Sequence, residues 1–133
     1  MKVVLDTNVL IAAFAAHGLC HLVLEAVLAH HKMLLSSGVI DELQSNLIKK
    51  LKLPSQRAKE IGMFLKHQSI FMKDLPVAHL ECRDKDDIKV LALAINGGAE
   101  AIVTGDKDLL VLKSIQGIPI LDPRNFWILL KAG

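Results

Sequence analysis

The chain has 133 residues, of which 52% are hydrophobic, a formal net charge of +2 and a mean hydropathy of +0.40. This length suits one domain with a well-filled core, and no apolar run approaches the roughly 18 residues needed to cross a bilayer. Only two cysteines are present, Cys20 and Cys82, so no disulfide framework is indicated.

Apolar runs and helical periodicity divide the chain into alternating strands and helices. Short apolar runs predict strands over residues 2–5, 33–36, 70–73, 101–103 and 118–121. Amphipathic stretches predict helices from about Val9, over 20–30, from Ser36 or Ser37 to 51, over 54–68, from Asp84 or Asp86 to 96, from Asp106 through Leu112, and from Asp122 and Pro123 onwards. This alternation, without a tight hairpin, predicts one α/β domain over residues 1–133, a three-layer α/β/α sandwich with a mostly parallel sheet.

Four carboxylates stand at positions that such a fold brings together. Asp6 and Asp106 each follow a strand directly, whereas Glu42 and Asp87 lie in the first turns of predicted helices. In an open α/β sheet, the carboxyl ends of the strands form the edge where ligands bind. Acids crowded into a cleft raise one another's pKa unless a cation neutralises them. The set therefore predicts a site for a hard divalent ion, Mg²⁺ or Mn²⁺.

Each acid also has a simpler explanation. Asp6 and Asp106 are well placed to cap helices and to interact with the helix dipoles. Glu42 could be an exposed residue on a helix surface. Capping alone, however, does not predict that all four acids stand at the same edge of one sheet.

Basic residues concentrate between residues 49 and 66, where Glu60 is the only acid. They are Lys49, Lys50, Lys52, Arg57, Lys59 and Lys66. A basic rim beside an acidic, metal-filled cleft suits a polyanion such as RNA. Two helices with solvated lysine-rich faces explain the stretch slightly better when it is taken alone, so on its own it does not identify a substrate-binding surface.

The motifs that carry these acids resemble the PIN-domain family over nearly the whole chain. The similarity lies in LDTNVLIAAF, VIDEL, CRDKDDIKVLALAINGGAEAIVTGDKDLL and IPILDPRNF, in that order. The resemblance implies a PIN-like sheet with strand order 3-2-1-4-5 and metal-dependent endoribonuclease activity. Within the family, the chain most resembles the compact prokaryotic, VapC-like members, which are classed as toxins of toxin–antitoxin pairs. It therefore implies RNA as the substrate, products with 5′-phosphate and 3′-hydroxyl ends, and a cognate antitoxin as a partner.

The resemblance also implies roles for individual residues. The metal-binding and catalytic acids would be Asp6, Glu42, Asp87 and Asp106, with Asn8, Thr104 and Asp108 as supporting polar residues. The third acid is the least certain position, because Asp84, Asp86 and Asp87 stand close together and the helical pattern does not exclude Asp86. Asp87 is preferred because the segment IKVLALA then falls in the family's register.

The chemistry expected of this set is hydrolysis by a metal-activated water. Asp6 and Asp106 would be the principal ligands of one or two Mg²⁺ or Mn²⁺ ions, and Asp87 and Glu42 would complete the site directly or through water. Glu42 is alternatively the group that helps to deprotonate the nucleophile.

Two other functions match part of the pattern. A phosphatase of the haloacid dehalogenase type also has an Asp after its first strand, but it needs a second Asp two residues later, where this chain has Asn8. Its late motif needs a further acid, and Leu110 stands four residues after Asp106. The other alternative is a non-catalytic PIN-like module that binds RNA or a protein partner.

The remaining features concern partners and location. The aromatic residues, most of them expected to be buried, are Phe14, Phe64, Phe71, Phe126 and Trp127. Recognition of RNA by shape and phosphate is therefore expected rather than base stacking. The apolar excess near the C-terminus favours a homodimer or higher oligomer. Because the segment MKVVLD lacks the apolar stretch of a secretory signal, we expect a cytoplasmic protein with reduced cysteines and no membrane partner.

Overall fold

The structure, a computed structural model, describes residues 1–80 and 85–132. Over these residues the strands are β1 (Lys2–Leu5), β2 (Lys32–Ser36), β3 (Ile70–Met72), β4 (Ala101–Val103), β5 (Ser114–Ile115) and β6 (Ile118–Leu121). The helices are α1 (Thr7–Ala15), α2 (Leu19–His30), α3 (Ser37–Leu51), α4 (Ser55–Gln68), α5 (Lys85–Gly97), α6 (Lys107–Leu110) and α7 (Pro123–Ala132). The possible contribution of Asp84 and the state of Cys82 lie outside the described residues.

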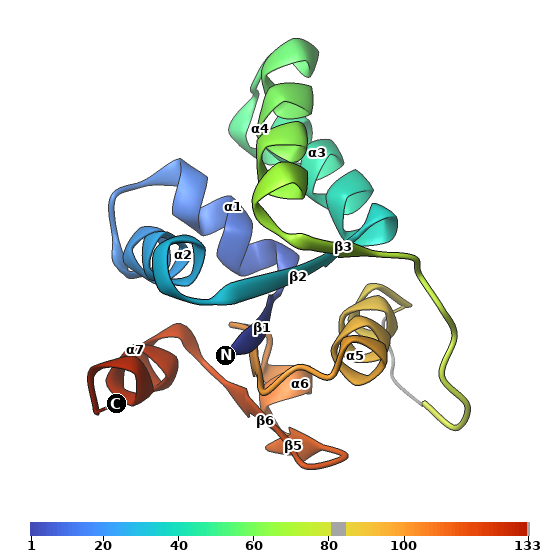
Figure 1. Ribbon diagram of the computed structural model, residues 1–133. Helices are drawn as coiled ribbons and strands as arrows, with labels where there is room; N and C mark the ends of the chain where they lie inside the picture. The colour runs from blue at the N-terminus through green and yellow to red at the C-terminus, as the bar shows by residue number, and fades with distance from the viewer. Residues whose placement is uncertain (81–84, 133) are drawn as a thin grey trace.

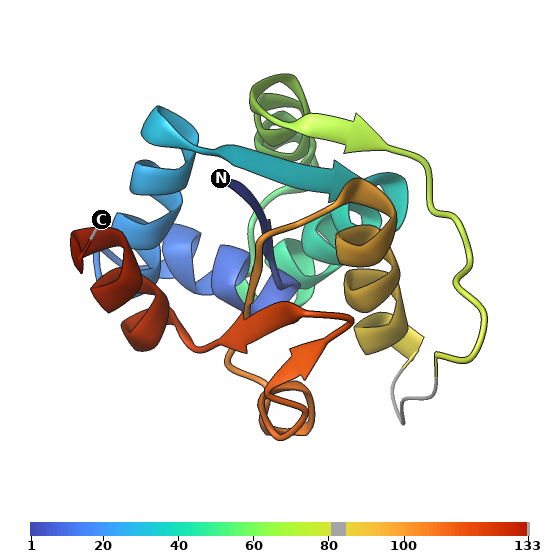
Figure 2. The same ribbon diagram turned by 60° about the horizontal axis from the view of Figure 1, so that its bottom comes forward.

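The strands form one sheet in the order β3-β2-β1-β4-β6-β5, with helices α1 to α4 on one side and α5 on the other (Figures 1 and 2). Neighbouring strands are parallel except for β5 and β6. Helix α7 packs on α2 and β6. The predicted α/β sandwich and the order of the five predicted strands are confirmed.

The register of the central strands defines the two edges of the sheet. Lys2 on β1 lies opposite Lys32 on β2, and Leu5 on β1 lies opposite Val103 on β4. The carboxyl ends of β1 and β4 therefore coincide, and Asp6 leaves the sheet at this edge. We call it the carboxyl edge and the opposite one, where β1 and β2 begin, the amino edge.

The prediction that the chain has no tight hairpin was wrong at the end of the sheet. β5 and β6 are antiparallel and are joined by Gln116 and Gly117, whose φ angles are 48° and 82°. Positive φ at both turn residues is the geometry of a type I′ hairpin turn, which matches the twist of the two strands. A strand of two residues is too short for an alternating pattern to reveal it.

The helix predicted from Asp106 through Leu112 is also shorter than expected. It ends at Leu110, and Val111 and Leu112 are 73% and 41% exposed. Lys113 adopts a left-handed conformation with a φ of 62°, which turns the chain into β5. The apolar residues beyond Leu110 suggested a buried helical face that the fold does not form.

The core is built on the continuous apolar strands of the sheet centre. Val3, Val4 and Leu5 of β1 are almost fully buried, because helices cover both faces of the sheet. The expectation that most aromatic residues are buried was wrong, since Phe126 alone among them is fully buried. Phe64 and Phe71 are 51% and 38% exposed, because α4 covers the core with one face only and β3 is an edge strand.

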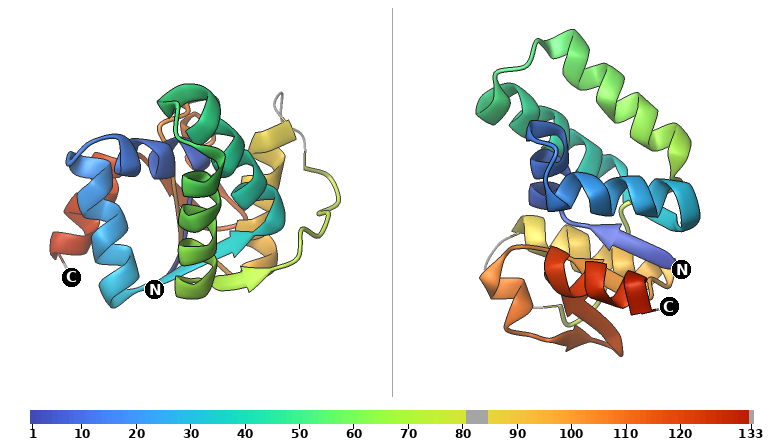
Figure 3. Two further views of the ribbon diagram at one scale, coloured as in Figure 1. Left: turned by 90° about the horizontal axis from the view of Figure 1, so that it is seen from above. Right: turned by 90° about the vertical axis from the view of Figure 1, so that its left-hand side faces the viewer.

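Within the described residues, no single helix has the length and apolar character required to span a membrane. Helices α1 and α2 reach that length and composition only when taken together, and a bend of 108° separates them. The two chain ends lie on the same side of the molecule, beside the amino edge (Figure 3).

Candidate functional site

Asp6 stands where β1 passes into α1. Its backbone N–H donates to the Val103 carbonyl of β4, at 2.9 Å, so the first residue after β1 is held against the neighbouring strand. The side chain is 6% exposed and makes no capping hydrogen bond to α1. Instead, its Oδ2 accepts a hydrogen bond of 2.7 Å from the Thr104 hydroxyl. Helix capping therefore does not explain why an aspartate is buried here.

Thr104 connects Asp6 to Asp106. The Thr104 side chain is fully buried, and its Oγ1 also accepts a hydrogen bond of 3.0 Å from the Asp106 backbone N–H. Asp106 in turn caps α6, because its Oδ1 accepts from the Asp108 backbone N–H at 2.9 Å. The structure thus brings together the acids that follow β1 and β4, as predicted, and one of the Asp106 oxygens also has the simpler capping role.

Glu42 lies in the second turn of α3 and is electrostatically coupled to the same edge. Burial raises the pKa of Glu42, and the negative charges of Asp86 and Asp6 raise it further. The hydroxyl of Thr7, buried in the first turn of α1, lies toward this carboxyl and partly opposes the rise, as does the charge of Lys89. Carboxylates from β1, α3 and α5 therefore repel one another in a shared region.

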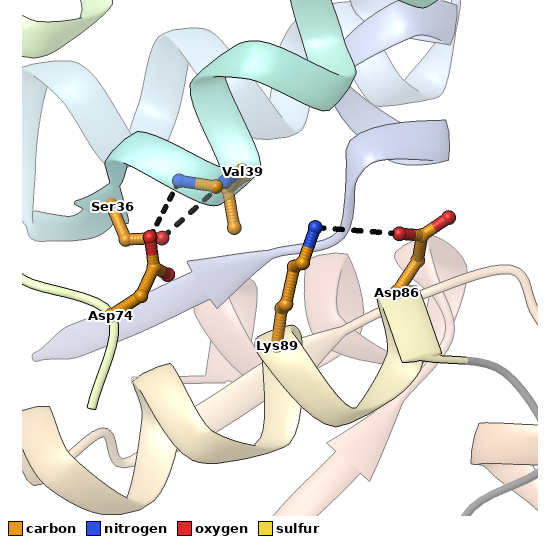
Figure 4. A network of polar contacts seen from close by, with 6 residues as sticks. Ser36, Val39, Asp74, Asp86 and Lys89 are labelled. Atoms are coloured by element: carbon orange, nitrogen blue, oxygen red, sulfur yellow. Dashed lines mark hydrogen bonds and ion pairs between the residues drawn. The ribbon is translucent and has the colours of Figure 1, made fainter. Parts of the chain in front are cut away.

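The two described acids of α5 have different surroundings. Asp86 is half-exposed and forms an ion pair of 3.7 Å with Lys89 one turn further along α5 (Figure 4). Asp87 is 5% exposed, nearly as buried as Asp6. The charge of Asp86 raises the pKa of Glu42, whereas Asp87 resembles Asp6 in being buried.

The supporting and basic residues lie in two different places. Asn8 and Asp108 are exposed in the first turns of α1 and α6, at the carboxyl edge. The basic residues sit at the far end of α3 and on α4, the helical hairpin at the top of Figure 1, and are Lys49, Lys50, Lys52, Arg57 and Lys59. At the rise of an α-helix, Lys49 is about 10 Å along the axis from Glu42. They therefore do not line the acidic site itself.

One contact at the carboxyl edge gave no signal in the sequence. Asp74, in the segment after β3, accepts a hydrogen bond of 2.7 Å from the Gly38 backbone N–H, and Ser36 accepts one from Val39 (Figure 4). A Cβ on Gly38 would stand 2.9 Å from the Asp74 carboxylate, so a larger residue would displace the Asp74 side chain from its hydrogen bond. Together these bonds fix the start of α3, which carries Glu42. Asp74 is 36 residues from Gly38 in the sequence, so the contact depends on tertiary packing.

The donor chemistry of the edge suits a hard divalent ion. Among the described residues, no three Asp, Glu, His or Cys side chains are grouped closely enough to hold a metal ion by themselves. Mg²⁺ does not require such a cage, because it is usually bound by one or two carboxylates and keeps several waters beside substrate phosphates. Carboxylates whose charges raise the pKa of a neighbouring acid fit this kind of site.

The structure is that of an α/β protein whose acids gather at the carboxyl edge of a mostly parallel sheet. Comparison with models of known protein families identifies the family. A profile of the PIN domain matches residues 2–108, which include all four predicted acids. The chain belongs to the PIN-domain family, as its motifs predicted. Members of this family are typically metal-dependent nucleases.

Solved structures with the same fold include VapC toxins of VapBC systems. VapBC2 from Rickettsia felis, bound to a DNA fragment from its promoter, is 18% identical, covering 92% of this chain and 98% of that chain with a TM-score of 0.65. VapC20 from Mycobacterium tuberculosis, a toxin that cleaves the sarcin–ricin loop, is 16% identical, covering 88% and 99% with a TM-score of 0.59. VapBC-1 from nontypeable Haemophilus influenzae is 13% identical, covering 93% and 99% with a TM-score of 0.65. No curated protein matches the sequence.

Proposed function

We propose that this protein is a Mg²⁺- or Mn²⁺-dependent endoribonuclease and the toxin of a toxin–antitoxin pair. The observation that carries the proposal is the link from Asp6 through Thr104 to Asp106 at the carboxyl edge. Glu42 joins this group because the charge of Asp6 raises its pKa. Such repulsion between acids is relieved by a bound cation.

Asp6, Asp106 and Asp87 would hold one or two divalent ions, and Glu42 would either complete the ligand set or act as the base for the attacking water. When bound, the ion supplies a water of lowered pKa and stabilises charge on the leaving 3′-oxygen. Thr104 keeps the Asp6 carboxylate in one orientation by donating a hydrogen bond to it. Glu42, whose pKa is raised, is suited to accept a proton from the attacking water. The products would carry 5′-phosphate and 3′-hydroxyl ends.

RNA is proposed as the substrate because of the family and the charge distribution. The VapC20 toxin, which shares the fold, cleaves the sarcin–ricin loop. The basic residues at the end of α3 and the start of α4 are exposed, where they would hold the RNA backbone on one side of the cleavage point. Exposed Phe64 on α4 adds a surface on which a base can stack.

The proposed protein partners are a cognate antitoxin and a second copy of the chain. Two of the structures with this fold are VapBC assemblies. Ile128 and Leu129 of α7 are 57% and 44% exposed, an apolar surface that association would cover. A cytoplasmic location follows from the proposed RNA substrate.

The proposal is tested by incubating purified protein with total RNA and mapping the new ends by sequencing. The wild type should cleave with Mg²⁺, and either EDTA or Asp6→Asn should lower the rate by at least about 10²-fold. Asp41→Asn is the matched control, because Asp41 is exposed on the same helix as Glu42. Full cleavage in EDTA or by Asp6→Asn would overturn the mechanism. Absence of cleavage together with failure to bind Mg²⁺ by calorimetry would assign a non-catalytic module, and hydrolysis of a small phosphomonoester would assign a phosphatase.

A further inference from the structure

A basic side chain lies at the acidic site itself. Lys89 stands one turn into α5, and its ammonium is 3.7 Å from Oδ1 of Asp86. The side chain extends from α5 toward the first turn of α3, the helix on which α5 packs (Figure 4). The positive charge of Lys89 also acts on Glu42 of α3 and opposes the rise in its pKa. Lys89 is therefore a cation of the carboxyl edge that faces the helix carrying Glu42.

The basic residues of the α3–α4 hairpin stand further from the acids. Lys49, for example, is about 10 Å along the helix axis from Glu42. Those residues are suited to hold RNA at a distance from the cleaved bond. Lys89 stands on the same helix as Asp87 and two residues after it, so its ammonium can reach a phosphate bound beside that proposed ligand.

The ion pair with Asp86 holds Lys89 only weakly. The two side chains are 45% and 49% exposed. Exposed ion pairs contribute little to stability, because water and salt screen them and because ordering two long side chains costs entropy. The ammonium can therefore exchange Asp86 for a stronger acceptor. A phosphate oxygen is such an acceptor, since charge-assisted bonds to phosphate are short and strong.

The acids of the carboxyl edge carry the same sign of charge as RNA. Asp6 and Asp86 already repel Glu42, and a phosphate brought to the same place is repelled in the same way. A divalent ion offsets part of this repulsion when it is bound. A lysine beside the acids offsets more of it, and a compact ammonium on a flexible stem adapts to a backbone phosphate of any orientation.

We propose that Lys89 is a substrate-binding residue of the nuclease site, whose ammonium leaves Asp86 to bind an RNA backbone phosphate next to the cleavage point. This proposal rests on the nuclease function proposed above. It has two consequences of opposite sign, because the same positive charge attracts RNA and repels a divalent ion. Removing the charge should weaken RNA binding and strengthen metal binding. A structural role of Lys89 predicts instead that both become weaker.

The RNA contact is tested by fluorescence anisotropy of the whole protein with a short labelled single-stranded RNA. EDTA prevents cleavage and leaves no divalent ion to mask the contribution of Lys89. Lys89→Gln should weaken the affinity by about fivefold, and the slope of log affinity against log salt should become shallower by about 0.7, the value of one phosphate contact on a single strand. Lys89→Arg, which keeps the charge, should bind within about twofold of the wild type.

The matched control is Lys131→Gln, which removes the same charge from an exposed lysine at the amino edge. It should leave both the affinity and the salt slope unchanged. Unchanged values in Lys89→Gln, or equal losses in the two variants, would overturn the proposal.

The metal arm uses calorimetric titration of the RNA-free protein with Mn²⁺. Lys89→Gln should bind Mn²⁺ about two- to fivefold more tightly, because a positive charge is removed from beside the acids, and Lys131→Gln should bind as the wild type does. Weaker Mn²⁺ binding by Lys89→Gln would mean that Lys89 supports the geometry of the acids, and would overturn the proposal. Neither arm requires cleavage, so its failure is distinguished from failure of the nuclease proposal, which loss of RNA cleavage by the wild type would show.

Discussion

The carboxyl and amino edges of the same sheet carry opposite charges. Helices α1, α5 and α6 begin at the carboxyl edge, where Asp6, Asp87 and Asp106 stand at or near their first turns. Helices α2 and α7 end at the amino edge with His30 and Lys131 in their last turns. Helix dipoles favour this distribution, because their positive ends meet the acids and their negative ends meet the bases.

The two edges differ in how their charged groups are held. At the carboxyl edge Asp6 is buried and bonded to Thr104, whereas Lys131 at the amino edge is exposed. A helix dipole contributes only about 0.3–1 kcal/mol per charge at an exposed position. That is too little to explain why Asp6 is buried at a position where its charge adds to the rise in the pKa of Glu42. The carboxyl edge is therefore organised for a cation, while the charges of the amino edge are only weakly constrained.

The largest expected effect distinguishes the two acids of α5. Asp87→Asn should lower the rate of Mg²⁺-dependent RNA cleavage by at least about 10²-fold, because Asp87 is nearly as buried as Asp6 and is the proposed ligand. Asp86→Asn should lower it by less than about tenfold, because Asp86 is half-exposed and pairs with Lys89. Steady-state cleavage rates measure both variants, and the reverse order would make Asp86 the ligand.

Removing the hydroxyl of Thr104 tests the link between Asp6 and Asp106. Thr104→Val keeps the side-chain shape but loses both hydrogen bonds, so we expect the cleavage rate to fall by about 10–100-fold. Thr104→Ser should recover most of the activity, because it restores the hydroxyl. Metal titration of the cleavage rate should show a weaker apparent affinity in the valine variant. An unchanged rate and affinity would mean that the orientation of Asp6 does not matter.

The start of α3 is tested by adding a methyl group. Gly38→Ala places a Cβ 2.9 Å from the Asp74 carboxylate and should cost about 0.5–1 kcal/mol of unfolding free energy, because the loss of this exposed hydrogen bond exceeds the gain in helix propensity of alanine over glycine. Gly105→Ala is the control, because nothing lies within 4 Å of its added Cβ and its backbone does not require glycine. Urea denaturation measures both. Equal stability of the two variants would show that Asp74 moves aside without loss.

The smallest expected effect is that of Glu42→Gln on the stability of the folded protein, and it depends on pH. Because the folded-state pKa of Glu42 is raised, ionisation of this group destabilises the folded protein as pH rises through that pKa. In EDTA, Glu42→Gln should therefore stabilise the protein at about pH 7.5 by roughly 0.5 kcal/mol, reduced by solvent screening. The difference should vanish below about pH 4, where the carboxyl is protonated in both states. Thermal unfolding at both pH values checks this, and destabilisation at the higher pH would contradict it.

The central strands and the positions of the acids could be predicted because each depends on adjacent residues. The apolar run before Asp6 and the run before Asp106 identify buried strands, and a parallel sheet brings their ends together. The contact of Asp74 with Gly38 could not be predicted, because it depends on how distant segments pack. The exposure of Phe71 depends on β3 being the last strand of the sheet, which the sequence of β3 does not reveal.

The most direct test of a cation site at the carboxyl edge is NMR with Mn²⁺, whose paramagnetism broadens the signals of nearby residues. Backbone signals of Asp6, Glu42, Asp87 and Thr104 should broaden at low Mn²⁺ concentrations, and excess Mg²⁺ should reverse the effect. Signals around His31 at the amino edge should broaden much less, because the effect falls with the sixth power of the distance from the ion, and Asp6→Asn should abolish the broadening. Broadening centred on the amino edge, or unchanged by Asp6→Asn, would contradict a metal site built on these acids.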